Sequence, residues 1–323
     1  PQKVPRFFYV RWTRGAYGII HIYAGRQFSR FRTKGNEDMA EENKSTLDPL
    51  AALCKRRGFI YHSSEIYGGM PGFWDYGPLG CELKQNVKQA WWQFTVRGRE
   101  DVVGLDATII MHPKIWKASG HLDTFADPMT MCKDCKKLMR ADQVKDIYAD
   151  QKKKPQPKVA GADFFCPYCG GELTEPKPFN LMFKTVVGPI DDPSNVAYLR
   201  PETAQAIFAQ FTNVTATSRM AVPYGIAQMG KSFRNEITPG NFTFRTREFE
   251  QMELEFFCMP GTDLEWFSYW RSYCHEWLKG LGIKEEHLRL RDRREEQTEL
   301  DLVVAVLCVE PRLKLVVPHQ REV

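Results

Sequence analysis

The chain has 323 residues, with 45 basic and 40 acidic side chains and a net charge of +5. Apolar residues make up 43% and charged residues 26%, which is ordinary for a globular protein and argues against a mostly disordered, collagen-like or disulfide-dense chain. The longest apolar run, residues 302–309, is too short to span a bilayer, so we expect no membrane association.

The positive excess is concentrated at the N-terminus. Residues 1–35 contain basic side chains and no acidic one. A nucleic-acid-binding arm, an organelle transit peptide, or sequence foreign to the folded protein would each fit this composition. The first methionine is Met39, which is a plausible natural start. We therefore treat residues 1–45 as a separate basic segment.

Hydrophobic spacing predicts a helix over residues 47–58 and a second helix over residues 82–96. A strand is expected over residues 102–111. Further on, the pattern predicts a strand at 196–200, a helix at 202–212, two long strands at 221–237 and 242–258, and a helix at 263–281. Strands flanked by helices, with an antiparallel hairpin near the end, indicate an α+β fold.

Two Cys-x-x-Cys pairs occur, Cys132 with Cys135 and Cys166 with Cys169. Two such turns can complete a closed tetrahedral thiolate site, which Zn²⁺ prefers and which is structural because it has no open position. The alternatives are four unligated surface cysteines or a redox role. The sequence contains nine cysteines and shows no secretory signal. We therefore expect metal thiolates, not disulfides, in a reducing, cytoplasmic location.

The predicted hairpin contains a concentration of chemically useful side chains. Because strand residues alternate, Arg234 and Glu236 share one face of the first strand. On the second strand one face holds Arg245, Arg247, Phe249, Gln251, Glu253 and Glu255, while Phe244, Met252, Leu254 and Phe256 form an apolar face. Arginines suit phosphates and an aromatic ring can stack on a base. The alternative is a salt-bridged solvent face on an ordinary hairpin.

These residues resemble a known family. Phe233-Arg234-x-Glu236, a loop, then Arg245-x-x-x-Phe249-x-x-x-Glu253 is similar to motif 2 of the class II aminoacyl-tRNA synthetases. Asp75-Tyr-Gly-Pro-Leu-Gly80 and Tyr198-Leu-Arg-Pro-Glu-Thr-Ala-Gln205 resemble the glycyl-tRNA synthetases of the homodimeric type. The resemblance covers roughly residues 46–293, and the cysteine-bearing insertion is similar to the metal module of some bacterial members.

The resemblance implies a class II catalytic domain, an antiparallel sheet flanked by helices, with an inserted zinc-ribbon-like module. In that family glycine and ATP, with Mg²⁺, form glycyl-adenylate, and glycine then passes to the 3′ end of tRNA(Gly). Arg234 and Glu236 are the implied catalytic residues. The implied ATP-binding residues are Arg234, Asn235, Glu236, Phe244, Arg245, Thr246, Arg247, Glu248 and Phe249. The implied glycine-binding residues are Arg99, Glu202, Phe249, Glu250, Gln251 and Glu253.

The resemblance also implies a domain order and a homodimer. Residues 46–130 would form the first part of the catalytic domain with motif 1, which builds the dimer interface. Residues 131–175 would be the zinc-binding insertion, and residues 176–293 the second catalytic part with motif 2. After residue 293 no motif 3 follows, so we treat 294–323 as an atypical tail and expect a truncated chain with little or no activity.

Two other functions fit parts of the sequence. A non-catalytic zinc-ribbon RNA-binding protein on a class II synthetase fold would explain the missing motif 3. The retained Arg234, Glu236, Arg245, Phe249 and Glu253 argue against that alternative. A class II synthetase for another amino acid is disfavoured by the sequence around Glu202 and Glu253.

Overall fold

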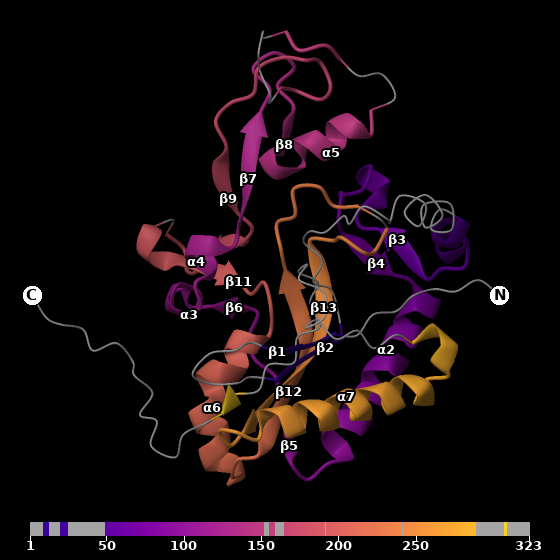
Figure 1. Cartoon of the computed structure of the whole chain (residues 1–323), viewed down its shortest axis with the longest axis vertical. Helices are drawn as coiled ribbons and strands as arrows, with labels where there is room; N and C mark the ends of the chain where they lie inside the picture. The colour runs from indigo at the N-terminus through magenta and orange to yellow at the C-terminus, as the bar shows by residue number, and fades with distance from the viewer. Residues whose placement is uncertain are drawn as a thin grey trace, which may run out of the picture. The chain divides into compact units, whose positions relative to one another are not determined.

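The computed structural model describes residues 9–12, 20–24, 49–151, 155–158, 165–190, 192–240, 242–288 and 307–308. These residues form helices and largely antiparallel sheets, so the predicted α+β class is confirmed (Figure 1). The chain divides into two compact units. The first unit takes its described residues from 1–109, 202–232 and 248–323, and the second from 110–201 and 233–247. Most of the predicted segments 1–45 and 294–323 lies outside the described residues.

A six-stranded sheet forms the centre of the first unit. Its strands follow the order β1 (Tyr9–Trp12), β2 (Ile20–Ala24), β13 (Glu248–Cys258), β12 (Tyr224–Phe233) and β5 (Val102–Leu105), with β14 (Leu307–Cys308) also paired to β13. β2 pairs antiparallel with β1 and β13, whereas β5 joins β12 in parallel. The neighbouring β12 and β13 are the two strands of the predicted hairpin.

The helices of the first unit are α2 (Pro78–Trp92), which continues into the π-helical turn η2 (Gln93–Arg97), α6 (Ala204–Ser218) and α7 (Asp263–Gly280). Residues 49–56 are also helical. A small hairpin of β3 (Ile60–His62) and β4 (Trp74–Tyr76) encloses the short helix η1 (Glu65–Tyr67), and η5 (Glu285–His287) follows α7.

Helices cover both faces of the central sheet (Figure 1). On one face Leu254 and Phe256 of β13 pack with Trp91 of α2 and with Trp270 and Trp277 of α7. On the other face Ile207 of α6 packs with Tyr224, Ile226 and Phe257. Alternation along the strands explains this division, since neighbouring residues point to opposite faces. Burying each such side chain contributes about 1.5–3 kcal/mol, which fixes β12 and β13 as rigid supports.

The second unit contains two three-stranded antiparallel sheets. One has β7 (Ala126–Met131) between β8 (Leu138–Arg140) and β9 (Lys177–Asn180), and the other has β11 (Val196–Leu199) between β10 (Lys184–Val186) and β6 (Ile110–Met111). The short helices of this unit are α3 (Pro113–Ala118), α4 (His121–Thr124), η3 (Ala141–Gln143), α5 (Val144–Ala149) and η4 (Pro193–Asn195).

The helix predicted over residues 82–96 begins earlier than expected, at Pro78. Proline at the first helical position supplies a suitable φ. Gly80 allows close packing, because a Cβ atom there would lie 1.8 Å from the carbonyl oxygen of Phe59. The strand predicted over residues 102–111 is interrupted between Leu105 and Ile110, and its two ends belong to different units.

The long hairpin strands are shorter than predicted. β12 ends at Phe233 and β13 begins at Glu248, so residues 234–247 form a loop. The expectation that Phe244 belongs to an apolar core face is therefore wrong, and its side chain is exposed. The expectation for Met252, Leu254 and Phe256 is confirmed. Among the described residues, no helix combines the length and apolar composition needed to cross a bilayer.

Candidate functional site

Arg234 stands at the start of the loop that joins β12 to β13. Its backbone N–H donates to the carbonyl of Arg247 at 2.9 Å, which closes the base of the loop. Its Nε donates to the carbonyl of Pro201 at 3.0 Å, and its guanidinium lies 5.4 Å from the ring centroid of Phe125. The next residue, Asn235, donates its backbone N–H to the carbonyl of Leu181. The arginine is thus held by its backbone, a carbonyl and an aromatic face.

Glu236 is brought together with both predicted arginines of the loop. Nε of Arg245 donates to Oε2 of Glu236 at 2.7 Å, and Nε of Arg247 donates to the backbone carbonyl of Glu236 at 3.0 Å. Reciprocal backbone hydrogen bonds between Gly240 and Arg245 fix the loop tip. Glu236 and Arg245 therefore satisfy each other here, and a nucleotide that engages both would replace this ion pair.

The first unit contains a buried polar cluster on one face of β12 and β13. Glu253 and Glu255 are fully buried, and Glu253 accepts a hydrogen bond from the Thr203 hydroxyl. Ser232 donates from its hydroxyl to the amide oxygen of Gln251 at 2.7 Å. Glu202, just before α6, accepts a hydrogen bond from Gln205.

Three carboxyl groups interact in this cluster. Burial raises the pKa of Glu255 well above its usual range, and the negative charge of Glu202 raises it further, while a hydrogen bond with Glu253 lowers it. Carboxylates crowded in a low-dielectric environment favour either a retained proton or a bound cation. The cluster is therefore chemically suited to a ligand ammonium group.

Glu250 and Glu248 lie on the opposite strand face from Gln251 and Glu253. Glu250 forms ion pairs with Lys84 at 2.7 Å and Lys88 at 3.1 Å, both on α2. Glu248 pairs with Lys231 of β12. The structure thus does not bring Glu250 together with Gln251 and Glu253, although all three were expected to bind glycine.

Arg99 is enclosed by aromatic residues of α7. Its Nε and Nη2 atoms donate to the two carboxylate oxygens of Asp101 at 2.8 and 2.7 Å. Its guanidinium carbon lies 4.4 Å from the ring centroid of Trp270 and 4.7 Å from that of Tyr273, and Nη1 donates to the Tyr269 hydroxyl. Although burial alone would lower the pKa of Arg99, these hydrogen bonds raise it. In this structure Arg99 ties the turn before β5 to α7.

The remaining predicted residues lie around the loop and the start of β13. Thr246 is buried, and Phe249 is half-buried at the second position of β13. Phe244 is exposed at the loop. The prediction that these three bind ATP stays a prediction.

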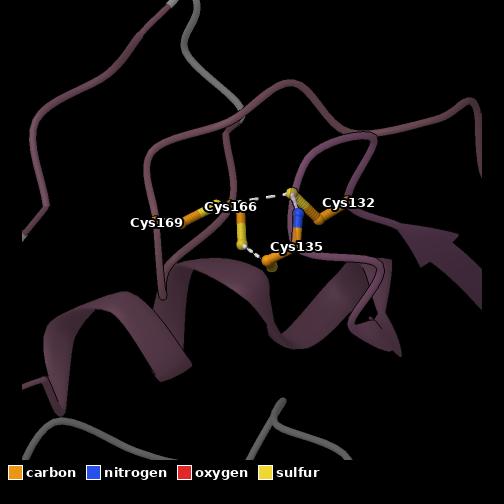
Figure 2. A group of neighbouring side chains, drawn as sticks. All are labelled: Cys132, Cys135, Cys166 and Cys169. Carbon is orange, nitrogen blue, oxygen red and sulfur yellow. Dashed lines mark hydrogen bonds between the residues drawn. The ribbon is translucent and has the colours of Figure 1, made fainter.

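The four cysteines Cys132, Cys135, Cys166 and Cys169 converge from two loops (Figure 2). Their sulfur atoms all lie within 4.8 Å of one another, with 3.5 Å between Cys132 and Cys169 and 3.7 Å between Cys135 and Cys166. Four thiolates about 2.3 Å from a tetrahedral Zn²⁺ would have sulfur atoms about 3.8 Å apart, so the donor set fits this ion.

The two cysteine loops have matching backbones. The residue after the second cysteine has a left-handed conformation in each, Lys136 with φ 59° and Gly170 with φ 74°. Glycine is needed at the latter position, because a Cβ atom there would lie 1.9 Å from the Gln156 carbonyl oxygen. Burial raises the pKa of the Cys166 thiol to about 12. Burial acts the same way at Cys132, but backbone hydrogen bonds from Cys135 and Asp134 outweigh it and lower that pKa to about 7.

Sequence reasoning missed two features near these sites. Gln228 lies four residues before Ser232 on β12, so the two side chains share one face of the strand, and Gln228 is fully buried. Arg140 is also buried and pairs with Asp127 and Asp142. Alternation along β12 could have indicated Gln228, whereas no sequence pattern connects Arg140 to Asp127.

Comparison with known proteins finds similarity to tRNA synthetases. Residues 183–313 match the tRNA synthetase class II core domain (G, H, P, S and T). The chain is 54% identical over 268 residues to a glycine–tRNA ligase of Lachnospira eligens, covering 79% of this chain and 58% of that protein. It is 53% identical over 274 residues to the Geobacillus thermodenitrificans ligase, covering 81% and 58%, and 56% identical over 245 residues to the Streptomyces coelicolor ligase, covering 75% and 53%.

The chain thus spans somewhat more than half the length of these curated relatives. A solved structure titled as the RNA binding domain of threonyl-tRNA synthetase from Cryptosporidium parvum overlaps 72% of this chain and 42% of that one, with 17% identity and a TM-score of 0.45. The matched core domain and the identity to several ligases confirm the family resemblance of the sequence motifs. The chain is thus similar to the class II core domain of the tRNA synthetases over residues 183–313, and over most of its length it is similar to glycine–tRNA ligases.

Proposed function

We propose that the protein is a glycine–tRNA ligase, which activates glycine with ATP and transfers it to the 3′ end of tRNA(Gly). The observation that carries this proposal is the loop 234–247, where Arg234, Glu236 and Arg245 are held in fixed positions within a chain similar to such ligases. The alternative, a non-catalytic RNA-binding protein on the same fold, has no comparable observation in its favour.

ATP would bind at this loop. Arg234 would contact the α-phosphate and stabilise the charge that develops as pyrophosphate leaves. Glu236 would accept a hydrogen bond from the adenine amino group, and Arg245 or Arg247 would reach the outer phosphates. Phe249 would stack on adenine, with Asn235, Phe244, Thr246 and Glu248 lining the site. Mg²⁺ bound with ATP would neutralise phosphate charge.

Glycine would bind at the buried polar cluster. Glu202 and Glu253 are anionic candidates for holding the substrate ammonium, and Gln251 offers an amide beside them. A buried site with little space would reject larger side chains by steric exclusion, which suits the smallest amino acid. Glu250 lies on the opposite face of β13, paired with Lys84 and Lys88, so we leave it out of this site. Arg99, paired with Asp101, would act indirectly.

Zn²⁺ would occupy the four cysteines as a structural ion in a zinc-ribbon-like module over residues 131–175. The closed thiolate set supports this role, because it leaves no position for a substrate or water. The ion would cross-link the two loops and contribute folding free energy. We propose residues 46–130 and 176–293 as the two parts of the catalytic domain on either side.

A homodimer and a cytoplasmic location complete the proposal. Large apolar side chains are exposed on η1, on the loop that follows it and on the first turns of α2, a concentration that favours a protein interface. They are Ile66, Tyr67, Met70, Leu79 and Leu83. Cysteines that act as metal thiolates must stay reduced, which suits the reducing cytoplasm.

The test is glycine-dependent exchange of pyrophosphate into ATP by an intact polypeptide that contains these segments. We expect exchange with glycine, and we expect Arg234→Ala to lower its rate by at least about a hundredfold, as for the loss of one transition-state charge contact. Lys279→Ala, at an exposed ion pair on α7, is the control and should leave the rate unchanged. Exchange stimulated by a different amino acid would overturn the substrate assignment.

A further inference from the structure

Arg140 is a buried cation with no part in the function proposed so far. Its side chain is 1% exposed, and Nη1 lies 2.8 Å from Oδ2 of Asp127, which is also buried. Its Nε and Nη2 donate to the two carboxylate oxygens of Asp142 at 3.2 and 2.9 Å. Arg140 is the last residue of β8, the strand that follows Cys135. It therefore belongs to the cysteine-bearing arm, by which we mean the sheet of β7, β8 and β9 with the two cysteine loops.

Asp127 lies on β7, next to the loop 234–247 of the same unit, which we call the nucleotide loop. Leu181 donates its backbone N–H to the carbonyl of Phe125, and its own carbonyl accepts the N–H of Asn235. The Arg234 guanidinium lies over the ring of Phe125. These contacts place residues 125–127 next to residues 234–236.

The charges across this junction alternate in sign. Asp127 interacts electrostatically with Arg140 and also with Glu236 and Arg245. Arg245 in turn is paired with Glu236 at 2.7 Å. Two carboxylates therefore act electrostatically on Arg245: Glu236, which is paired with it, and the buried Asp127, which is paired with Arg140. If Arg140 were removed, Asp127 would be left uncompensated and would compete with Glu236 for Arg245.

We infer that Arg140 is a positioning residue for the nucleotide. Because Arg140 pairs with Asp127, Arg245 stays paired with Glu236, and the Glu236 carboxylate stays oriented toward an adenine amino group. This inference rests on the proposed function, because it takes Glu236 as the group that recognises adenine. It links the cysteine-bearing arm to nucleotide selectivity. A purely structural role for Arg140 would instead affect every nucleotide alike.

The experiment measures glycine-dependent exchange by the same intact polypeptide with two nucleotides, ATP and purine riboside triphosphate, which lacks the amino group. We expect Arg140→Met to raise KM for ATP about threefold to thirtyfold, the usual range for coupling through packed side chains. KM for purine riboside triphosphate, kcat and bound zinc should stay unchanged. Lys117→Ala, at an exposed ion pair of the same unit, is the matched control and should change none of them.

If Asp127 competes with Glu236 for Arg245, a second substitution at Asp127 should reverse the effect of Arg140→Met. Asp127→Asn removes the competitor, so adding it to Arg140→Met should restore the wild-type KM for ATP. The double variant has no unpaired buried charge between these positions, which protects its folding. If the single Met variant does not fold, Arg140→Lys should show a smaller rise that is also specific to ATP.

Equal effects on both nucleotides, or a double variant that behaves like Arg140→Met, would overturn the inference. So would an Arg140→Lys variant with an unchanged preference for ATP. A wild-type protein with no glycine-dependent exchange would instead contradict the proposed function, so the two failures are distinguishable.

Discussion

Glu255 lies on β13 with its side chain fully buried, beside Glu253 and in electrostatic contact with Glu202. Burial and the charge of Glu202 raise its pKa well above the usual range, despite the hydrogen bond with Glu253. A carboxyl group in this position keeps its proton to a higher pH than an exposed one. It can then donate a hydrogen bond within the cluster, which limits the negative charge that a substrate ammonium would meet.

Replacing Glu255 by Gln should therefore stabilise the fold in a pH-dependent way. Below about pH 4.3, the ordinary pKa, both folded and unfolded wild-type chains hold the proton and the variant has no electrostatic advantage. As pH rises above that value the unfolded wild type loses its proton while the folded one retains it, so wild-type stability falls until pH reaches the raised pKa. The advantage of the variant grows by about 1.4 kcal/mol per pH unit across that window.

Urea unfolding of both proteins at pH 5 and pH 7.5 measures this difference. An advantage for the Gln variant that is equal at the two pH values would contradict a raised Glu255 pKa. Glu276→Gln is the control, because Glu276 is exposed on α7.

At the scale of elements, β13 shows what a sequence can predict and where it stops. The two-residue alternation along β13 predicts Met252, Leu254 and Phe256 on one face and Gln251, Glu253 and Glu255 on the other. The structure confirms that separation. The same alternation places Glu250 against α2, but the motif resemblance grouped it with Glu253. The sequence pattern does not predict where these strands end. Residues 234–247 hydrogen-bond to one another and to the distant carbonyls of Leu181 and Pro201 instead of continuing the strand ladder.

The ion pairs of Glu250 tie α2 to β13, and their loss should weaken that contact. Burial alone would raise the pKa of Glu250, but hydrogen bonds and charges of Lys84 and Lys88 outweigh it and lower the pKa. This contribution is present above the ordinary pKa of about 4.3 and is lost as pH falls through the lowered folded pKa. We expect Glu250→Gln to reduce the free energy of unfolding by about 1–2 kcal/mol at pH 7, because two partly buried lysines lose their partner.

Thermal or urea unfolding between pH 3 and pH 7 checks this expectation. The deficit of the Gln variant should shrink toward zero at the acidic end. A deficit that persists there would mean that packing, and not charge, accounts for the effect of the substitution.

At the scale of the whole molecule, motifs distant in sequence are distributed over two units. Arg234, Glu236 and Arg245 belong to the second unit, whereas Glu202, Glu253 and Arg99 belong to the first. Sequence order could predict which motifs occur, because each is short and local. It could not predict that the second unit combines the cysteine loops with residues 233–247, since that association depends on contacts such as Asn235 with Leu181.

The two units should respond differently to loss of the metal. The first unit has its own apolar cores around Trp270 and Phe257, while the core next to the cysteines is small and includes Cys132 and Cys166 themselves. We expect about one zinc ion per chain, lost when Cys166 and Cys169 become Ser. Hydrogen exchange should then accelerate across residues 131–175 and stay slow in β12 and β13, because the ion supplies folding free energy only locally.

Replacing Cys54 and Cys81, which lie outside the cluster, is the control and should keep the zinc. Unchanged exchange in 131–175 after zinc removal would show that these loops fold without a metal.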